Sequence, residues 1–264
     1  MRVKSSSAPT AALRHHQAGG NAAFTMIEIA LSLAVIGFAL VAIIGVLPLG
    51  LEVQKENREE TVINHDANYF MDAIRHGARG LDELTNHVVT ITTASQAYDA
   101  DTNAVGLLDV LEYDYAGTTV PAWPLDSGSN IVGLLSRPKY QPTGSGGFRS
   151  NYVVAHVRSL SGPATEKFPQ TDPTIKDLGF SYRIISEIVP LATYDTNSAH
   201  GRNLQANMHE VRLLFRWPLL PGNKTGNGRQ VYRSLVGGIH TNYPSGSPLW
   251  FFQPAIFTTV NAAP

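Results

Sequence analysis

The sequence predicts an α+β protein in which one long N-terminal helix, transmembrane and then amphipathic, packs on a mostly antiparallel β-sheet domain. An apolar run over residues 24–51 continues into an amphipathic stretch over 52–80, where apolar residues recur every three or four positions. From residue 87 the pattern changes to strand-like alternation, in segments separated by turn residues. Strands that follow one long helix favour an antiparallel sheet laid against that helix.

The apolar run is long enough to cross a membrane. No charged residue occurs from Ile29 to Leu51, and a helix of that length covers the roughly 30 Å of a bilayer's hydrocarbon core. The preceding residues 1–23 contain no acid and three bases: Arg2, Lys4 and Arg14. A short basic flank stays cytoplasmic, so the chain after the helix is expected on the other side of the membrane.

One carboxylate, Glu28, lies at the start of this run. A charge inside an apolar helix costs several kcal/mol and is usually kept for a partner. The residues around it read Ala23-Phe24-Thr25-Met26-Ile27-Glu28, directly after Gly-Gly-Asn-Ala. This pattern resembles the processing site of type IV prepilins and type II secretion pseudopilins. Further matches to that family are Ile27, Leu31 and Gly37, whereas Ala23 stands where the family most often has Gly.

The resemblance implies a specific maturation. Prepilin peptidase would cut between Ala23 and Phe24, Phe24 would be N-methylated, and Glu28 would be the family glutamate that acts in assembly together with Thr25. In a filament of packed helices, a buried amine and a buried carboxylate of neighbouring subunits can satisfy one another. The implied fold is pilin-like, and the chain's size favours a minor subunit.

The resulting organisation is a basic prepilin leader (1–23), a transmembrane and filament-core helix (24–51), its amphipathic continuation (52–80) and a β-rich globular domain (81–264). The implied partners are other pilin or pseudopilin subunits, prepilin peptidase, the inner-membrane assembly platform and membrane lipid. The protein is expected to cross the inner membrane once, with its N-terminus cytoplasmic and its C-terminal domain periplasmic or extracellular in the filament. With a net charge of −1, no overall field favours nucleic acid.

Pro48 interrupts the helical pattern, with Gly45 close by. Proline removes a backbone donor and clashes with the preceding turn, so a kink or local unwinding is expected around Ile44 to Pro48. A static kink and a functional hinge are both open interpretations of these residues.

Six segments of the globular domain are predicted to be strands, and turn-rich stretches separate them. The strands are 87–93, 107–113, 151–157, 180–189, 208–217 and 228–236. The last two are expected to form a hairpin with a long loop, and an apolar run over 249–260 is expected to close the sheet. Loops are expected over 117–130, 137–147, 161–172 and 193–207.

The residues Asp99, Asp101 and Asn103 place oxygen ligands at alternate positions, as at the start of a calcium loop. Ala104 and Val110 stand where an EF-hand needs Gly and Glu, which favours a solvated polar turn, so no metal or other cofactor is assigned. The chain has no Cys, no nucleophile elbow and no phosphate-binding Gly loop, so it is not expected to be an enzyme.

Two other functions remain open at this point. One is a membrane-tethered surface binding or adhesion module that is displayed by the prepilin route and uses the loops at 117–147 and 193–207. The other is a plain signal-anchored protein, in which the apolar run has no role beyond anchoring.

Overall fold

The structure is a computed structural model that describes residues 24–77, 82–114, 123–143, 146–161, 180–191 and 198–260. The chain divides after Gln54 into two units. The predicted leader, residues 1–23, and the predicted loop 161–172 beyond its first residue lie outside the described residues.

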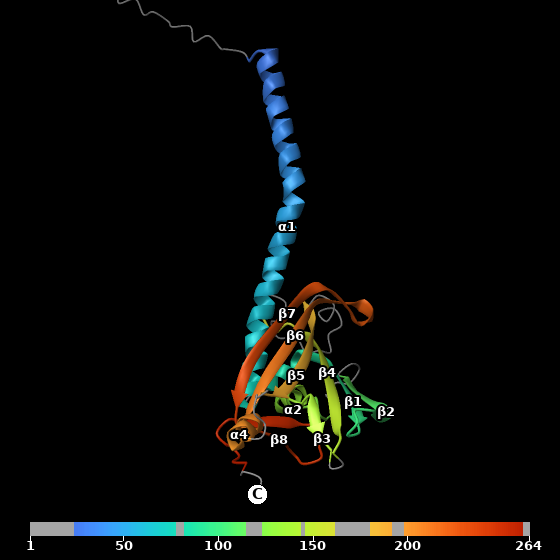
Figure 1. The fold of residues 1–264 in the computed structure, drawn as a ribbon. Coiled ribbons are helices and arrows are strands. Elements are labelled where there is room, and N and C mark those ends of the chain that lie inside the picture. Colours follow the sequence, from blue (N-terminus) through green and yellow to red (C-terminus); the bar gives the residue numbers. More distant parts are fainter. Residues whose placement is uncertain are drawn as a thin grey trace, which may run out of the picture. The chain divides into compact units, whose positions relative to one another are not determined.

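The long N-terminal helix is confirmed. Helix α1 runs from Met26 to His76 (Figure 1). It ends at Gly77, whose φ of +71° is a left-handed conformation that favours glycine and commonly closes helices. Arg75 and His76 lie in the last turn, where positive charge is favourable against the helix dipole. Helical conformation continues through Ile44 to Pro48, so the local unwinding expected there is absent from this structure.

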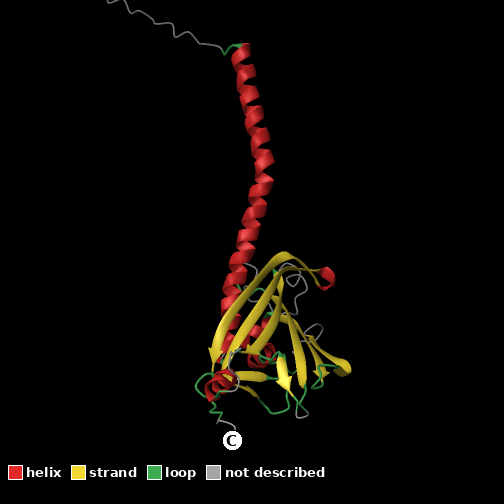
Figure 2. Ribbon diagram, viewed as in Figure 1, coloured by secondary structure: helices red, strands yellow, loops and turns green. Residues whose placement is uncertain are grey.

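The second unit contains a sheet in the order β2-β1-β4-β5-β6-β7, with β3 paired to β4 (Figure 2). Every neighbouring pair is antiparallel, which confirms the predicted α+β class. The strands are β1 (Val88–Tyr98), β2 (Ala104–Asp114), β3 (Tyr140–Pro142), β4 (Phe148–Arg158), β5 (Ser181–Pro190), β6 (Met208–Leu220) and β7 (Lys224–Gly237).

The end of the chain does not close this sheet, contrary to the expectation for 249–260. Strand β9 (Trp250–Gln253) pairs instead with β8 (Ile239–Asn242) in a separate two-stranded sheet. Gly238, with φ +106°, separates β8 from the end of β7. A β-carbon there would lie 2.4 Å from the Gln253 carbonyl oxygen, so glycine permits this close approach.

The hairpin between β6 and β7 is tighter than predicted. A single turn of 3₁₀ helix, η2 (Pro221–Asn223), joins the strands, and β7 already begins at Lys224. Of the glycines that suggested a long loop, Gly222 lies in η2, whereas Gly226 and Gly228 lie in the strand, where the Trp217 indole covers Gly228. A β-carbon on Gly228 would lie 2.4 Å from that ring.

Short helices occur in the second unit as well. They are η1 (Asp82–Asn86), α2 (Gly128–Leu135) and α4 (Ala199–Asn207). Both α2 and α4 overlap segments predicted as loops, 117–130 and 193–207. Ser198 caps α4 by accepting a hydrogen bond from the Gly201 N–H at 3.0 Å, a signal that the turn-rich composition concealed.

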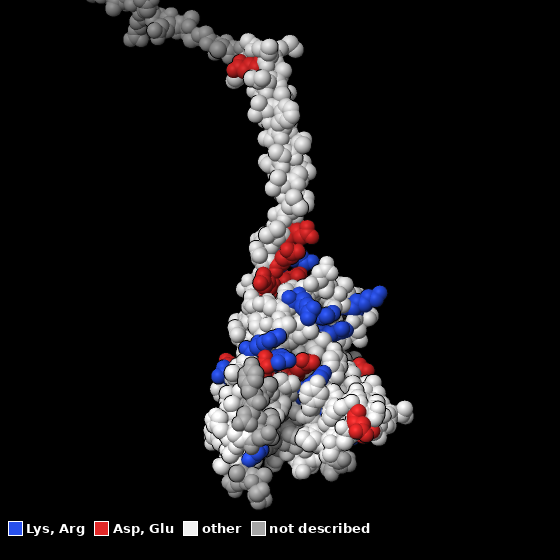
Figure 3. Space-filling view, in the orientation of Figure 1, with Lys and Arg blue, Asp and Glu red and all other residues white. Residues whose placement is uncertain are grey.

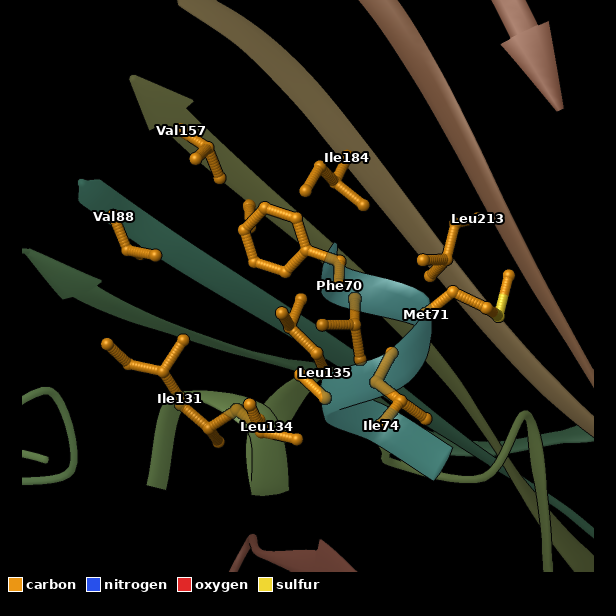
Figure 4. Close-up of a cluster of buried hydrophobic side chains, with 14 of the residues drawn as sticks. Phe70, Met71, Ile74, Val88, Ile131, Leu134, Leu135, Val157, Ile184 and Leu213 are labelled. Carbon is orange, nitrogen blue, oxygen red and sulfur yellow. The ribbon is translucent and has the colours of Figure 1, made fainter. Parts of the chain in front are cut away.

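The hydrophobic core lies between the inner face of the sheet, the second half of α1 and α2. Figure 4 shows Phe70, Met71 and Ile74 of α1 among side chains of the strands, with Leu134 and Leu135 of α2 beside them. Ile63, Ala67, Phe70 and Ile74 are completely buried. Their three- and four-residue spacing is the apolar stripe that the sequence predicts.

A buried carboxylate, Asp66, joins the helix to the sheet within this core. Its oxygens accept hydrogen bonds from the Leu160 N–H at 2.9 Å, the Ser161 hydroxyl at 2.8 Å and the Tyr182 hydroxyl at 2.9 Å. Burial, with the negative charge of Asp66, holds the pKa of Tyr182 well above its usual range. The hydroxyl therefore stays protonated as a donor, and α1 is tied to β5 and to the segment after β4.

Candidate functional site

The candidate site is the start of α1, and Thr25 organises it. The Glu28 N–H donates to the Thr25 hydroxyl oxygen at 3.3 Å and to the Thr25 carbonyl oxygen at 3.0 Å. Thr25 is thus the N-cap and Glu28 the third helical residue, which is the Thr-x-x-Glu spacing of a capping box. A carboxylate in the first turn also faces the positive end of the helix dipole. The Thr-x-x-Glu spacing is visible in the sequence, but the family resemblance assigned these two residues to assembly and not to a helix cap.

Apolar side chains surround this charge, and the chain itself does not cover them. Every residue from Phe24 to Arg58 is exposed, with Phe24 74%, Met26 91% and Ile27 78% accessible. By length and composition, α1 contains one segment near the N-terminus that could span a membrane. The predominantly apolar surface over residues 24–51 is of a size that favours lipid or protein as a partner.

The structure places the remaining predicted residues of this segment as follows. Phe24 lies just before the first turn of α1, while Ala23, on the other side of the predicted cut, lies outside the described residues. Gly45 and Pro48 lie inside the helix, and a β-carbon on Gly45 would meet no atom within 4 Å. Their role as a hinge stays a prediction.

The calcium candidate is a hairpin turn between β1 and β2. The Asp99 carboxylate accepts the Asn103 N–H at 2.7 Å and the Asn103 side-chain amide at 3.3 Å. Thr102 has a φ of +64°, and the Thr102 N–H donates to the Asp99 carbonyl oxygen at 3.1 Å. Both carboxylate oxygens thus hold the turn itself. Among the described residues, no group of three or more His, Asp or Glu side chains is arranged to hold a metal ion.

A pair of histidines, which the sequence did not single out, lies where the small sheet meets β6. The rings of His209 and His240 are 5.4 Å apart, and His240 stacks on Phe252 at 4.4 Å. Burial, together with the neighbouring His209, lowers the pKa of His240 to about 3. Burial also lowers the pKa of His209. Both rings are therefore neutral at neutral pH, and they pack as aromatic side chains of the core.

A third histidine, His156, bridges strands on the outer face of the sheet. Its Nε2 atom accepts from the Arg183 Nε–H at 3.2 Å, and its Nδ1 atom lies 3.1 Å from the Thr90 hydroxyl oxygen. Burial and the adjacent Arg183 lower the pKa of His156. The neutral ring thus has a hydrogen-bonding partner at each nitrogen, and these partners link β4 to β1 and to β5.

Comparisons of the chain with protein-family models, with curated proteins and with solved structures find no match. The resemblance to pilins therefore rests on the sequence of residues 23–51. A long N-terminal apolar helix with an antiparallel sheet on its second half is consistent with a pilin-like fold.

Proposed function

We propose that this chain is a structural subunit, pseudopilin-like or minor-pilin-like, of a type II secretion pseudopilus or a type IV pilus-like filament. The observation that carries the proposal is an exposed apolar segment, residues 24–51, whose only charged residue is Glu28, four residues after Phe24. Such a helix can lie in lipid before assembly and against other helices afterwards, since both environments are apolar. In the second environment, the carboxylate needs a positive partner.

The maturation that goes with this function follows from the resemblance. Prepilin peptidase cuts between Ala23 and Phe24, and the new amino group of Phe24 is methylated. That amine then lies close in sequence to the Thr25 cap and can pair with Glu28 of a neighbouring subunit. The globular unit is translocated, and the inner-membrane assembly platform extracts the helix from lipid. No catalytic role is proposed for the chain.

Mass spectrometry of the purified protein's N-terminus tests this maturation. A mature chain that begins with methylated Phe24 is the expected result. An intact Met1 would reject processing and leave a plain signal-anchored protein. Processing without assembly would favour the tethered binding module instead.

Variants of Glu28 separate its two candidate roles. Glu28→Val removes the charge and the side-chain acceptor suited to a capping box, although its backbone N–H can still donate to Thr25. Glu28→Gln keeps a side chain suited to the capping box and removes only the charge. Both variants are expected to lose co-assembly with wild-type subunits, measured by co-purification of two differently tagged chains. Glu52→Gln, beyond the apolar run, is the matched control and should assemble normally. Normal assembly of Glu28→Gln would show that the charge is not needed.

A further inference from the structure

One edge of the large sheet is an open, acidic and apolar strand. Every residue of β2 is exposed except the half-buried Tyr113, and within the described residues β2 pairs only with β1. Leu107 is 95% and Leu108 57% accessible. The strand contains Asp109, Glu112 and Asp114 and neither Lys nor Arg. The Gln96 side chain donates to the carbonyl oxygens of Val105 and Gly106 at one end of this strand. A long edge strand with exposed apolar side chains is suited to pairing with another strand.

The opposite edge is open, basic and apolar. Among the described residues, β7 pairs only with β6. It contains Lys224, Arg229 and Arg233 and neither Asp nor Glu. Val231 and Leu235 on its outer face are 42% and 51% accessible. Figure 3 shows basic side chains over the β5–β7 part of the sheet, with some acidic ones among them, and further acidic side chains towards the β1–β2 end.

The strand directions fit a junction of these two edges. The path from β2 to β7 contains six strands, four of them between the two edges, and each neighbouring pair is antiparallel. The two edge strands therefore run in opposite directions. When a second copy is placed beside the first in the same orientation, its β7 lies antiparallel to the first copy's β2.

The register of the sheet also matches. Glu112 lies in one row across the outer face with Thr92, Val154, Ile185, Leu214 and Val231. Continuing that row into the next copy puts Glu112 opposite Val231, with Arg229 and Arg233 diagonally on either side. Further along the same edge, Leu108 lies at the irregularity of β2 between Val105 and Asp109 and comes near Leu235 of the next copy. Cross-strand pairs of opposite charge and of apolar side chains each stabilise a sheet.

We infer that the β2 edge of one copy of this chain pairs with the β7 edge of the next copy, which continues the sheet from subunit to subunit. Pairing of like edges is disfavoured, since β2 beside β2 opposes acids and β7 beside β7 opposes bases. The unlike pairing uses two different surfaces of each copy and does not close on itself as a two-fold dimer does. It generates a row of copies. This deepens the proposed filament function, although the surface itself lies in the globular unit.

Disulfide cross-linking of the full chain in membranes tests the junction, and the absence of native Cys gives a clean background. A chain with both Leu108→Cys and Leu235→Cys is expected to give a ladder of dimers, trimers and larger products on mild oxidation. Two single-Cys chains mixed together should give dimers only. The matched control pairs Leu108→Cys with Leu214→Cys, which lies on the same face one strand inside the edge, and should give no product.

Two cross-linking results would overturn the inference. Dimers formed by Leu108→Cys alone, at the yield of the double variant, would show a two-fold β2–β2 contact. Absence of any ladder, while differently tagged copies still co-purify through the apolar helix, would show that subunits assemble without this junction. A ladder in a chain that keeps an intact Met1 would instead reject the proposed maturation and leave the junction standing.

Charge reversal gives an independent readout on the same cross-linking background. Glu112→Arg and Arg229→Glu are each expected to lower the ladder yield several-fold, and their combination is expected to restore it. Both residues are exposed, so the variants leave the core unchanged. Equal yields in all three variants would contradict the electrostatic basis of the pairing.

Discussion

At the level of single residues, two carboxylates of the same helix meet opposite environments. Glu28 is exposed in the first turn of α1, and its N–H is capped by Thr25. Asp66 is completely buried and accepts hydrogen bonds from three donors. The first carboxylate can serve a partner outside the chain, whereas the second is fully used in holding the chain's own fold.

Replacing Asp66 by Asn is expected to destabilise the globular unit by about 2–4 kcal/mol. The amide keeps one acceptor oxygen but turns an NH₂ group towards donors that remain buried. Urea unfolding followed by tryptophan fluorescence measures this loss. Asp72→Asn, at an exposed position on the same helix, is the control and should change stability little. Equal effects of the two variants would contradict the role of Asp66 as a tie between helix and sheet.

The pKa of His240 predicts a loss of stability in acid. Because its folded-state pKa is about 3 against an ordinary value near 6.5, the neutral ring stabilises the fold. That contribution is complete above pH 6.5 and is lost progressively as the pH falls towards 3. At pH 5 the loss is about 2 kcal/mol. The lowered pKa of His209 acts in the same direction.

Unfolding in urea at pH 7 and at pH 5 measures this dependence. His240→Phe keeps an aromatic ring against Phe252 and should flatten the profile between these two values. His200→Phe, in the exposed first turn of α4, is the control and should retain the wild-type slope. A wild-type slope in His240→Phe would place the acid sensitivity elsewhere.

At the level of elements, α1 serves two environments within one helix. Its buried residues begin at Ile63, while its residues up to Arg58 are all exposed. Pro48 lies in the exposed part and leaves the Ile44 carbonyl without its usual helical donor. The helical conformation is nonetheless continuous there.

Replacing Pro48 by Ala restores that donor and is expected to slow amide hydrogen exchange in the turns around Ile44 to Leu49. In the proposed hinge, the same variant also assembles less well because the helix opens less readily. Gly37→Ala, nearer the N-terminus of α1, is the control. It tests whether a general gain in helix stability has the same effect. Unchanged exchange around Pro48 in Pro48→Ala would show that proline does not loosen this region.

At the level of the whole molecule, the chain divides into an exposed apolar unit and a unit with its own core. All buried hydrophobic side chains among the described residues lie at position 63 or later. We therefore expect the fold of the second unit not to depend on the first.

A fragment of residues 55–264 is accordingly expected to be soluble without detergent and to unfold at the same urea concentration as the full chain. Solubility and unfolding curves of both proteins measure this. A shorter fragment that begins at residue 72 lacks Asp66 and Phe70 and should not fold. An unfolded 55–264 fragment would mean that the apolar helix contributes to the core.

The sequence by itself determined the long helix, its apolar and amphipathic halves and most strands, because these depend on local periodicity and on composition. The buried stripe from Ile63 to Ile74 and the alternation along β6 were both confirmed. The resemblance at Phe24 to Glu28 also came from sequence alone, and its functional consequences stay predictions.

Only the tertiary structure decided how the remaining segments pack. Local composition made 218–227 a loop, but β6 continues to Leu220 and β7 already begins at Lys224. It also made 249–260 a strand of the large sheet, but the turn at Gly238 directs β8 and β9 into a separate pair. The strand order makes β2 and β7 the two edges of the large sheet. The acids of β2 and the bases of β7 therefore lie at opposite ends of that sheet. Such long-range pairing depends on residues far apart in the chain, and local periodicity carries no information about it.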